Sequence, residues 1–261
     1  MEHYLDNSAT TVASLAAAKK AFEMMTENYA NPSSLHYRGM LAEQELEKAR
    51  KAVAKQLFAQ TDEIIFTSGG TEANNLALFG TAYAKKRRGT KIVTTSVEHS
   101  SIMESCKRLE QEGFEIAYVS PRQDGVVHTE DILAEVNDNT VLVSVMYVNN
   151  ETGAIMPVAE IFDAVKGKKS DIICHTDAVQ AFGKIAVNPK KLGADLVSVS
   201  AHKVHSPKGC GAIYIKKGVR LVPRTYGGVE QDVFLNGALE IKTLLYPEEL
   251  LALLNRIEAE A

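Results

Sequence analysis

Short apolar segments alternate with amphipathic ones along most of this chain. Seven segments rich in Val and Ile have the length and composition of β-strands: Glu63–Thr67, Lys91–Ser96, Glu115–Ser120, Val141–Tyr147, Asp171–Thr176, Leu196–Ser200 and Ala212–Ile215. Segments with helical periodicity lie between most of them: Glu72–Lys86, Ser101–Gln111, Thr129–Glu135 and Val158–Val165. Several strands are almost continuously apolar, as expected for strands buried on both faces. The pattern predicts a three-layer α/β/α fold with a mostly parallel seven-stranded sheet.

The segments before and after this alternation are less regular. Residues 3–11 are expected to form a short strand and a polar turn, followed by helices at Ala13–Thr26 and Tyr37–Phe58 with a capping serine in the loop between them. After Gly228 no period is clear until Leu244–Ile257, which has the apolar stripe of an amphipathic helix. We therefore expect a large domain over residues 1–228 and a helical segment over residues 229–261, which is too short for a second domain of usual size.

Composition and charge argue against several classes of protein. The chain has 261 residues, of which 45% are hydrophobic and 24% charged, and its net charge is -4. This balance gives no broad basic surface for nucleic acid or an anionic membrane. From the apolar pattern we expect neither a membrane span nor a signal peptide. Three widely spaced cysteines favour the reducing cytoplasm over a disulfide framework.

Lys203 is the first candidate for chemistry, because it follows the predicted buried strand Leu196–Ser200. The polar loop that holds it also contains His202 and His205. Ligands of α/β proteins bind at the carboxyl ends of strands. Burial and neighbouring cations lower the pKa of an amine, which makes it a nucleophile toward carbonyl groups. A Schiff-base lysine for pyridoxal phosphate (PLP) needs these properties, although a solvated surface lysine would fit this loop alone equally well.

A glycine-rich turn follows the first predicted strand. The segment Thr67–Asn75 reads Thr-Ser-Gly-Gly-Thr-Glu-Ala-Asn-Asn and opens a helix. Glycines let the backbone approach a ligand closely, and a helix N-terminus offers free N–H groups to a phosphate. Gly70 and Thr71 are therefore candidate phosphate contacts. The segment fits neither the Walker nor the dinucleotide-binding pattern, and an ordinary glycine turn with Thr71 as helix N-cap would also explain it.

Three further strand ends carry polar residues that suit the same ligand. Asp177 could keep the ring nitrogen of PLP protonated, and Gln180 could hydrogen-bond the ring's phenolic oxygen. His99 could stack on the ring or relay protons, and Asn150 could donate to the ring oxygen. Each also has an ordinary structural explanation, such as Asp177 capping the next helix. Together, five strand ends carry a phosphate loop, a histidine, an asparagine, an aspartate and a lysine, which match the parts of PLP.

Several short motifs extend this correspondence along the chain. They are Leu5–Thr11, Asn31–His36, Thr67–Asn75, Glu98–His99, Val148–Gly153, Asp177–Gln180, Ser200–Lys203 and Pro207–Gly209. From about residue 3 to residue 228, the chain resembles the cysteine desulfurases of the class V aminotransferase family, which are fold-type-I PLP enzymes of the NifS/IscS kind.

The resemblance implies a role for each candidate residue. Lys203 would carry PLP and act as the base that takes the substrate's α-proton, and Asp177 would pair with the ring nitrogen. His99 would stack on the ring, while Asn150 and Gln180 would meet the ring oxygen. The phosphate would be held by Gly70, Thr71, Ser200 and His202. The resemblance also implies a homodimer that converts L-cysteine to L-alanine and passes the sulfur to an acceptor protein, for iron–sulfur cluster or thio-cofactor synthesis.

After Gly228 the chain departs from the family pattern. Val229–Val233 stands where the family has an Arg-Ser-Gly-Thr-like run, whose threonine reaches the partner subunit's phosphate. The family's catalytic cysteine loop and substrate-carboxylate arginine are not found. We interpret Cys106, Cys174 and Cys210 as structural, because free cysteine is usually a small buried hydrophobe. We therefore expect a desulfurase-like large domain whose C-terminal part is lost, replaced or shortened, and which binds PLP but releases little sulfide.

Three alternatives stay open. A related PLP lyase or transaminase, such as a selenocysteine lyase-like enzyme, would depend less on a cysteine. A non-catalytic scaffold would suit the altered C-terminal segment but gives no reason for Lys203, Asp177 and His99 to occur together. A zinc site is disfavoured, because the candidate ligands lack the close pairing of structural zinc motifs, and no metal site is predicted. Those ligands are Cys174, His175, His202, His205 and Cys210.

Overall fold

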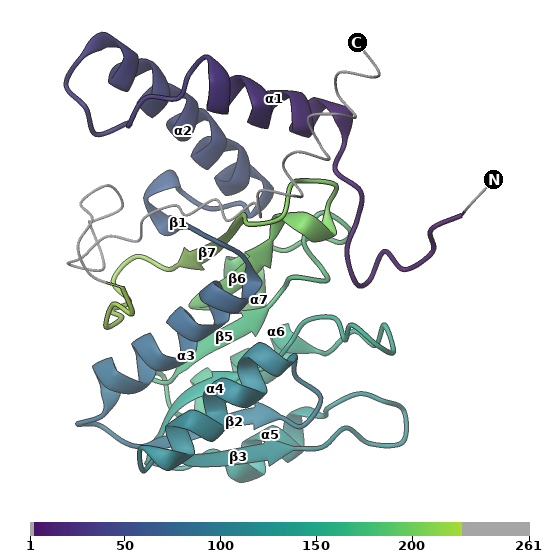
Figure 1. Ribbon diagram of the computed structural model, residues 1–261. Coiled ribbons are helices and arrows are strands. Elements are labelled where there is room, and N and C mark those ends of the chain that lie inside the picture. Colours follow the sequence, from purple (N-terminus) through teal and green to yellow (C-terminus); the bar gives the residue numbers. More distant parts are fainter. Residues whose placement is uncertain (1–2, 226–261) are drawn as a thin grey trace.

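A seven-stranded sheet forms the centre of the computed structural model, which describes residues 3–225 (Figure 1). Its strands are β1 (Ile64–Thr67), β2 (Lys91–Thr95), β3 (Glu115–Val119), β4 (Thr140–Ser144), β5 (Ile173–Asp177), β6 (Leu196–Ser200) and β7 (Gly211–Ile215). Their order is β1-β7-β6-β5-β4-β2-β3. Strand β7 is antiparallel to both neighbours, and the other neighbouring pairs are parallel. The seven predicted strands are confirmed, with ends that differ by a few residues.

Helices cover both faces of this sheet (Figure 1). One face is covered by α3 (Gly70–Lys85) and α4 (Ser100–Gln111), and the other by α5 (Thr129–Glu135), α6 (Val158–Lys168) and the short α7 (Pro189–Leu192). The first two helices, α1 (Leu15–Thr26) and α2 (Tyr37–Gln56), lie beside the β1 edge. Ala54 and Leu57, at the end of α2, pack into the same core as α6. The predicted three-layer α/β/α fold is confirmed.

The core lies on both sides of the sheet, because alternate residues of each strand point to opposite faces. In β7, Ile213 and Ile215 pack with α3 and α4, whereas Ala212 and Tyr214 join the core beneath α6. Every residue of β7 is buried. A strand buried on both faces needs apolar residues at successive positions, which is why these strands read as continuous apolar runs.

Two expectations for the first forty residues are wrong. Residues 3–11 form no strand; the expected turn is present, with the Ala9 N–H donating to the Asp6 carbonyl at 3.2 Å. Among the described residues no strand pairs with this segment, and its polar groups form hydrogen bonds with the loop around Lys203. A serine does not cap α2, because His36 is its N-cap and accepts a hydrogen bond from the Gly39 N–H at 3.2 Å.

Other differences concern short or undescribed segments. Helix α7 and the 3₁₀ turns Thr61–Glu63 and Ala201–Lys203 were not predicted, because three or four residues are too few to show a helical period. Some expectations concern residues outside the described part of the chain and stay predictions. They are those for Val229–Glu240 and Leu244–Ile257, and the domain boundary after residue 228. Within residues 3–225, no helix combines the length and the apolarity needed to cross a bilayer.

The sheet topology brings five loops to one edge. The carboxyl ends of β1, β2, β4, β5 and β6 point the same way, and the amino end of the reversed strand β7 lies beside them. Gly211 begins β7 where it passes close to the turn after β1, and a Cβ atom on it would lie 2.7 Å from the Cα of Gly69. Glycine is therefore required at this contact. The predicted site residues follow these strand ends.

Candidate active site

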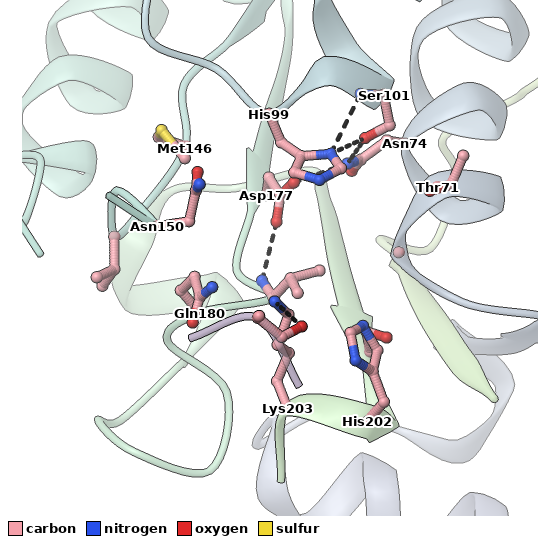
Figure 2. Close-up of a pocket in the computed structure, with 15 residues that line it drawn as sticks. Thr71, Asn74, His99, Ser101, Met146, Asn150, Asp177, Gln180, His202 and Lys203 are labelled. Atoms are coloured by element: carbon pink, nitrogen blue, oxygen red, sulfur yellow. Dashed lines mark hydrogen bonds between the residues drawn. The ribbon is translucent and has the colours of Figure 1, made fainter. Parts of the chain in front are cut away.

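A cavity of ≈ 220 Å³ lies at the carboxyl edge of the sheet. All nine residues singled out from the sequence line it: Gly70, Thr71, His99, Asn150, Asp177, Gln180, Ser200, His202 and Lys203. In the view of Figure 2, His99 and Lys203 lie on opposite sides of Asp177. The fold therefore gathers into one space the side chains for which we predict a common ligand.

The turn between β1 and α3 forms a narrow cradle on one side of this cavity. Its Gly69 has a φ of 155° and is the N-cap of α3 without offering a side-chain acceptor. The N–H groups of the first helical turn therefore have no capping side chain. A Cβ atom on Gly70 would lie 2.7 Å from Cγ2 of Val179, so the space depends on a glycine. Thr71 is not the N-cap, because the helix begins one residue earlier.

Ser200 adds an unpartnered hydroxyl beside the cradle. It ends β6, its residue is 1% exposed, and its Oγ has no hydrogen-bond partner within residues 3–225. A buried hydroxyl without a hydrogen-bond partner is unfavourable unless a bound ligand supplies the partner. An uncapped helix N-terminus and a free hydroxyl together suit the oxygens of a phosphate.

Asp177 is a buried carboxylate on the floor of the cavity. Its Oδ1 accepts from the Val179 N–H at 2.9 Å, and its Oδ2 accepts from Asn74 Nδ2 at 2.7 Å. Burial raises the pKa of this carboxyl, although both hydrogen bonds and the nearby His99 and Lys203 oppose the rise. A cation beside the carboxylate would offset its desolvation. The Val179 contact stabilises a turn and does not start a helix, so the capping explanation is wrong.

His99 occupies the N-cap position of α4. Its Nδ1 accepts from the Ser101 N–H at 3.1 Å and lies 2.8 Å from Ser101 Oγ. The ring lines the cavity, and its other nitrogen has no partner within residues 3–225. The N-cap geometry therefore fixes where the imidazole stands, because Nδ1 must face the helix backbone.

Lys203 ends the 3₁₀ turn that follows β6. Its Nζ donates to the Ala9 carbonyl at 2.8 Å and also to the Ser8 carbonyl. Burial is the main reason that the pKa of this amine is lowered, and the nearby Lys184 lowers it further. The lowered pKa of Lys203 agrees with the prediction. The neighbouring cation that contributes to it is Lys184, however, and not one of the flanking histidines.

A strap of residues 6–14 runs along the loop that holds Lys203. The Thr11 N–H and hydroxyl donate to the His202 carbonyl at 2.9 and 2.8 Å, and the Thr11 hydroxyl accepts from the His205 N–H at 2.8 Å. Gln180 Nε2 donates to the Ser8 carbonyl at 2.8 Å. The sequence did not predict this strap, although its residues 6–11 belong to the motif Leu5–Thr11. The polar groups of the strap form hydrogen bonds with the loop around Lys203, and not with a neighbouring strand.

Two polar residues in the cavity wall, Asn74 and Ser101, were also missed. Asn74 lies one turn after Gly70 on α3, and Ser101 lies two residues after His99. Residues four apart share one face of a helix, so the spacing from Gly70 is the signal that could have found Asn74. The pairing of Asn74 with Ser101, at 2.9 Å, has no signal in the sequence, because it joins two helices.

The three cysteines lie away from the cavity lining. Cys106 on α4 and Cys174 on β5 are fully buried, and burial raises the pKa of each thiol to about 12. Burial also raises the pKa of the partly exposed Cys210. The thiolate is the reactive form, so none of these cysteines is activated as a nucleophile. Among the described residues, no group of three or more His, Cys, Asp or Glu side chains is placed to hold a metal ion.

His175 lies two residues before Asp177 and is fully buried in β5. Its Nδ1 is 2.8 Å from Ser144 Oγ, and its Nε2 is 3.0 Å from Ser198 Oγ. Burial lowers the pKa of this imidazole to about 3. The ring is therefore neutral in the folded chain and ties β5 to the strands on either side.

This buried imidazole should make the chain sensitive to acid. Below the ordinary imidazole pKa, the unfolded state gains a proton that the folded state does not accept until about pH 3, so stability is lost as the pH falls. In a His175→Asn variant, the free energy of unfolding should fall less steeply between about pH 6 and 4, by up to ~1.4 kcal/mol per pH unit. Urea titrations over this range measure the slope, with exposed His3→Asn as the control. Equal slopes for His175→Asn and the wild type would contradict the assignment.

The cavity fits PLP on three observed features. An amine of lowered pKa stands at Lys203, Asp177 is a buried carboxylate that forms no ion pair within residues 3–225, and an uncapped helix N-terminus lies beside the free hydroxyl of Ser200. These groups complement the aldehyde, the ring nitrogen and the phosphate of PLP.

Comparison with protein families decides the classification. A family model described as aminotransferase class-V matches residues 3–241. The chain belongs to the class-V aminotransferase family. The family is PLP-dependent, in agreement with the features of the cavity.

Several curated proteins are similar to this chain over most of its length. A cysteine desulfurase IscS of Methanosarcina thermophila is 42% identical over 228 residues, and one of Dictyoglomus turgidum is 43% identical over 231 residues. These matches cover 87% and 88% of this chain, but 56% and 58% of the relatives. The chain therefore spans little more than half the length of these curated relatives.

Solved structures of other proteins share the fold. A NifS-like protein superposes with a TM-score of 0.88 at 37% identity, covering 99% of this chain and 71% of the other. A protein described as SspA in complex with cysteine superposes with a TM-score of 0.87 at 31% identity, covering 98% of this chain and 72% of the other. The class-V assignment and the three-layer fold thus agree.

Proposed function

We propose that this chain forms the PLP-binding part of a cysteine desulfurase, which converts L-cysteine to L-alanine and transfers the sulfur. The observation that carries the proposal is the convergence of Lys203, Asp177 and His99 on one cavity beside an uncapped helix N-terminus. The match of most of the chain to relatives named cysteine desulfurase supports the substrate.

The chemistry of each side chain in the cavity suits it to a different role in this reaction. Bound PLP would withdraw electrons from the amino acid and so acidify its α-proton. The Lys203 amine, with its lowered pKa, takes that proton. Asp177 would keep the ring nitrogen of PLP protonated, and His99 would cover the face of the ring. Gly70, Thr71, Ser200 and His202 would contact the phosphate, and Asn150 and Gln180 would contact the ring oxygen.

Sulfur transfer needs a thiolate in addition to these groups. The substrate's Cβ–S bond breaks, the sulfur forms a new S–S bond with the thiolate, and Cβ ends with a proton in L-alanine. Cys106, Cys174 and Cys210 have raised thiol pKa values and do not line the cavity. The acceptor thiolate is therefore expected from outside this sequence. A homodimer, a sulfur-acceptor protein and a cytoplasmic location are part of the same proposal.

The proton step can be tested separately from sulfur transfer. In deuterated water, the PLP-loaded chain should exchange the α-hydrogen of L-cysteine about 10²-fold or more faster than free PLP, while sulfide and alanine appear slowly. Mass spectrometry of the amino acid and a sulfide assay measure the two steps. A loaded chain that is no faster than free PLP in either step would refute the proposal. With a reducing thiol added to release the sulfur of a persulfide, rapid sulfide and alanine formation that Cys210→Ala abolishes would show that Cys210 is the nucleophile after all.

A related PLP lyase or transaminase is the second candidate, which is favoured by the fact that no cysteine is among the residues of 3–225 that line the cavity. Such an enzyme would act on other amino acids without a thiolate. Alanine and pyruvate formation from L-cysteine, L-selenocysteine and L-alanine with a 2-oxo acid separates the two functions. Exchange restricted to L-cysteine supports the desulfurase, whereas fast turnover of L-selenocysteine or transamination supports the alternative.

A further inference from the structure

Asn74 connects the carboxylate of Asp177 to the helix that holds His99. Its side chain is 1% exposed, and its Nδ2 donates both to Asp177 Oδ2 at 2.7 Å and to Ser101 Oγ at 2.9 Å. A carboxylate only accepts hydrogen bonds, so the amide nitrogen must face Asp177. The Asn74 Oδ1 is buried without a partner among the described residues. The two donor contacts therefore set the orientation of this amide.

Ser101 connects Asn74 to the imidazole of His99 through its hydroxyl group. Its hydroxyl oxygen accepts from Asn74, so its single hydrogen is available to His99 Nδ1, 2.8 Å away. The Ser101 backbone N–H donates to the same ring nitrogen at 3.1 Å. Nδ1 thus accepts two hydrogen bonds and has no position left for a proton of its own. Figure 2 shows both contacts on the side of the ring that faces Ser101.

We propose that Asn74 and Ser101 are positioning residues that fix neutral His99 as the tautomer with its proton on Nε2. The Nε2 atom has no partner within residues 3–225, and the ring lines the cavity. His99 therefore offers the cavity a hydrogen-bond donor and not an acceptor. A protonated Nδ1 would force the Ser101 hydroxyl to turn away from the ring and would break the N-cap hydrogen bond.

One consequence for catalysis rests on the proposed function. A ring nitrogen that already carries a proton cannot accept another, so His99 Nε2 does not serve as the base for the substrate's α-proton in this state. That task falls to Lys203, whose amine pKa is lowered by burial. His99 can cover a flat ring and donate one hydrogen bond from a fixed direction.

The tautomer can be measured on the cofactor-free chain. Two-bond ¹H–¹⁵N correlation spectra of the ¹⁵N-histidine-labelled chain at alkaline pH distinguish protonated from unprotonated ring nitrogens, and His99→Gln identifies the His99 signals. The wild type should show the proton on Nε2. Ser101→Ala removes the hydroxyl but keeps the backbone N–H, so the ratio of the two tautomers should shift about fivefold toward Nδ1–H. Ser101→Thr keeps a hydroxyl and should restore the wild-type ratio.

Matched controls separate this role from a general loss of structure. Ser100→Ala changes the neighbouring exposed serine on the same helix and should leave the His99 signals unchanged. Unchanged signals of buried His175 show that each variant keeps the fold. The proposal is refuted if wild-type His99 carries its proton on Nδ1, or if Ser101→Ala and Ser100→Ala give the same ratio. No cofactor is present in these measurements, so failure of the proposed function would leave their outcome unaffected.

Discussion

A Lys203→Ala variant is expected to lose all covalent attachment of PLP. The wild-type chain with added PLP should show a visible absorption band, and borohydride should then fix the cofactor mass on the peptide that contains Lys203. Lys203 is the one lysine among the described residues that line the cavity, and the pKa of its half-buried amine is lowered by desolvation and by the nearby Lys184. The variant should also exchange the substrate's α-hydrogen about 10²- to 10⁴-fold more slowly, which is the usual contribution of a positioned base.

Lys184→Ala is the matched control for this experiment. It removes the cation that helps to lower the pKa of Lys203, but it leaves the Lys203 side chain in place. The covalent link should persist, and the pH at which it forms should rise. Cofactor mass on a different lysine of the wild type would contradict the assignment of Lys203, and an unchanged band in Lys203→Ala would do so as well.

An Asp177→Asn variant is expected to bind PLP about 10²- to 4 × 10³-fold more weakly and to lose most α-hydrogen exchange. A buried ion pair that loses one partner is destabilised by about 3–5 kcal/mol, because the remaining charge stays uncompensated. The amide also cannot hold the ring nitrogen protonated, so the electron-withdrawing power of the cofactor falls. Equilibrium titration with PLP and the exchange assay measure these two effects.

Glu98→Gln provides a second buried carboxyl for comparison. Glu98 accepts from Thr95 Oγ1 and from the Met146 N–H, both at 2.8 Å, and burial raises its pKa to about 8. It is therefore mostly protonated at neutral pH, and a neutral glutamine should change PLP affinity little. If both variants weakened PLP to the same extent, burial and not the charge of Asp177 would explain the loss.

The sheet and the position of the site could be predicted from the sequence because both depend on local patterns. Continuous apolar runs such as Val141–Tyr147 identify buried strands, and the carboxyl ends of parallel strands meet at one edge. The candidate residues at those strand ends, of which Gly70 is the first and Lys203 the last in the chain, line one cavity. Their catalytic and binding roles stay predictions, as does the resemblance-based assignment of each PLP contact.

Contacts between distant segments could not be predicted in this way. The hydrogen bonds of Asn74 with Asp177 and Ser101 join three elements that the chain separates by up to 103 residues. The cation that lowers the pKa of Lys203 is Lys184, which lies on a different loop. The cap of α2 is a histidine, a residue type that is less common at this position than serine. Each of these contacts depends on how distant segments pack against one another, which cannot be inferred from a single sequence.

The strap of residues 6–14 also determines when the site can form during synthesis. Its contacts with the Lys203 loop join residues up to 195 positions apart. A ribosome adds about 5–20 residues per second, so residues 6–14 wait on the order of 10–40 s after their own synthesis before their binding partners emerge. Residues 6–14 can therefore be placed only after strands β1 to β6 have been made, and the lysine pocket and the inserted strand β7 are completed in the same late stage of synthesis.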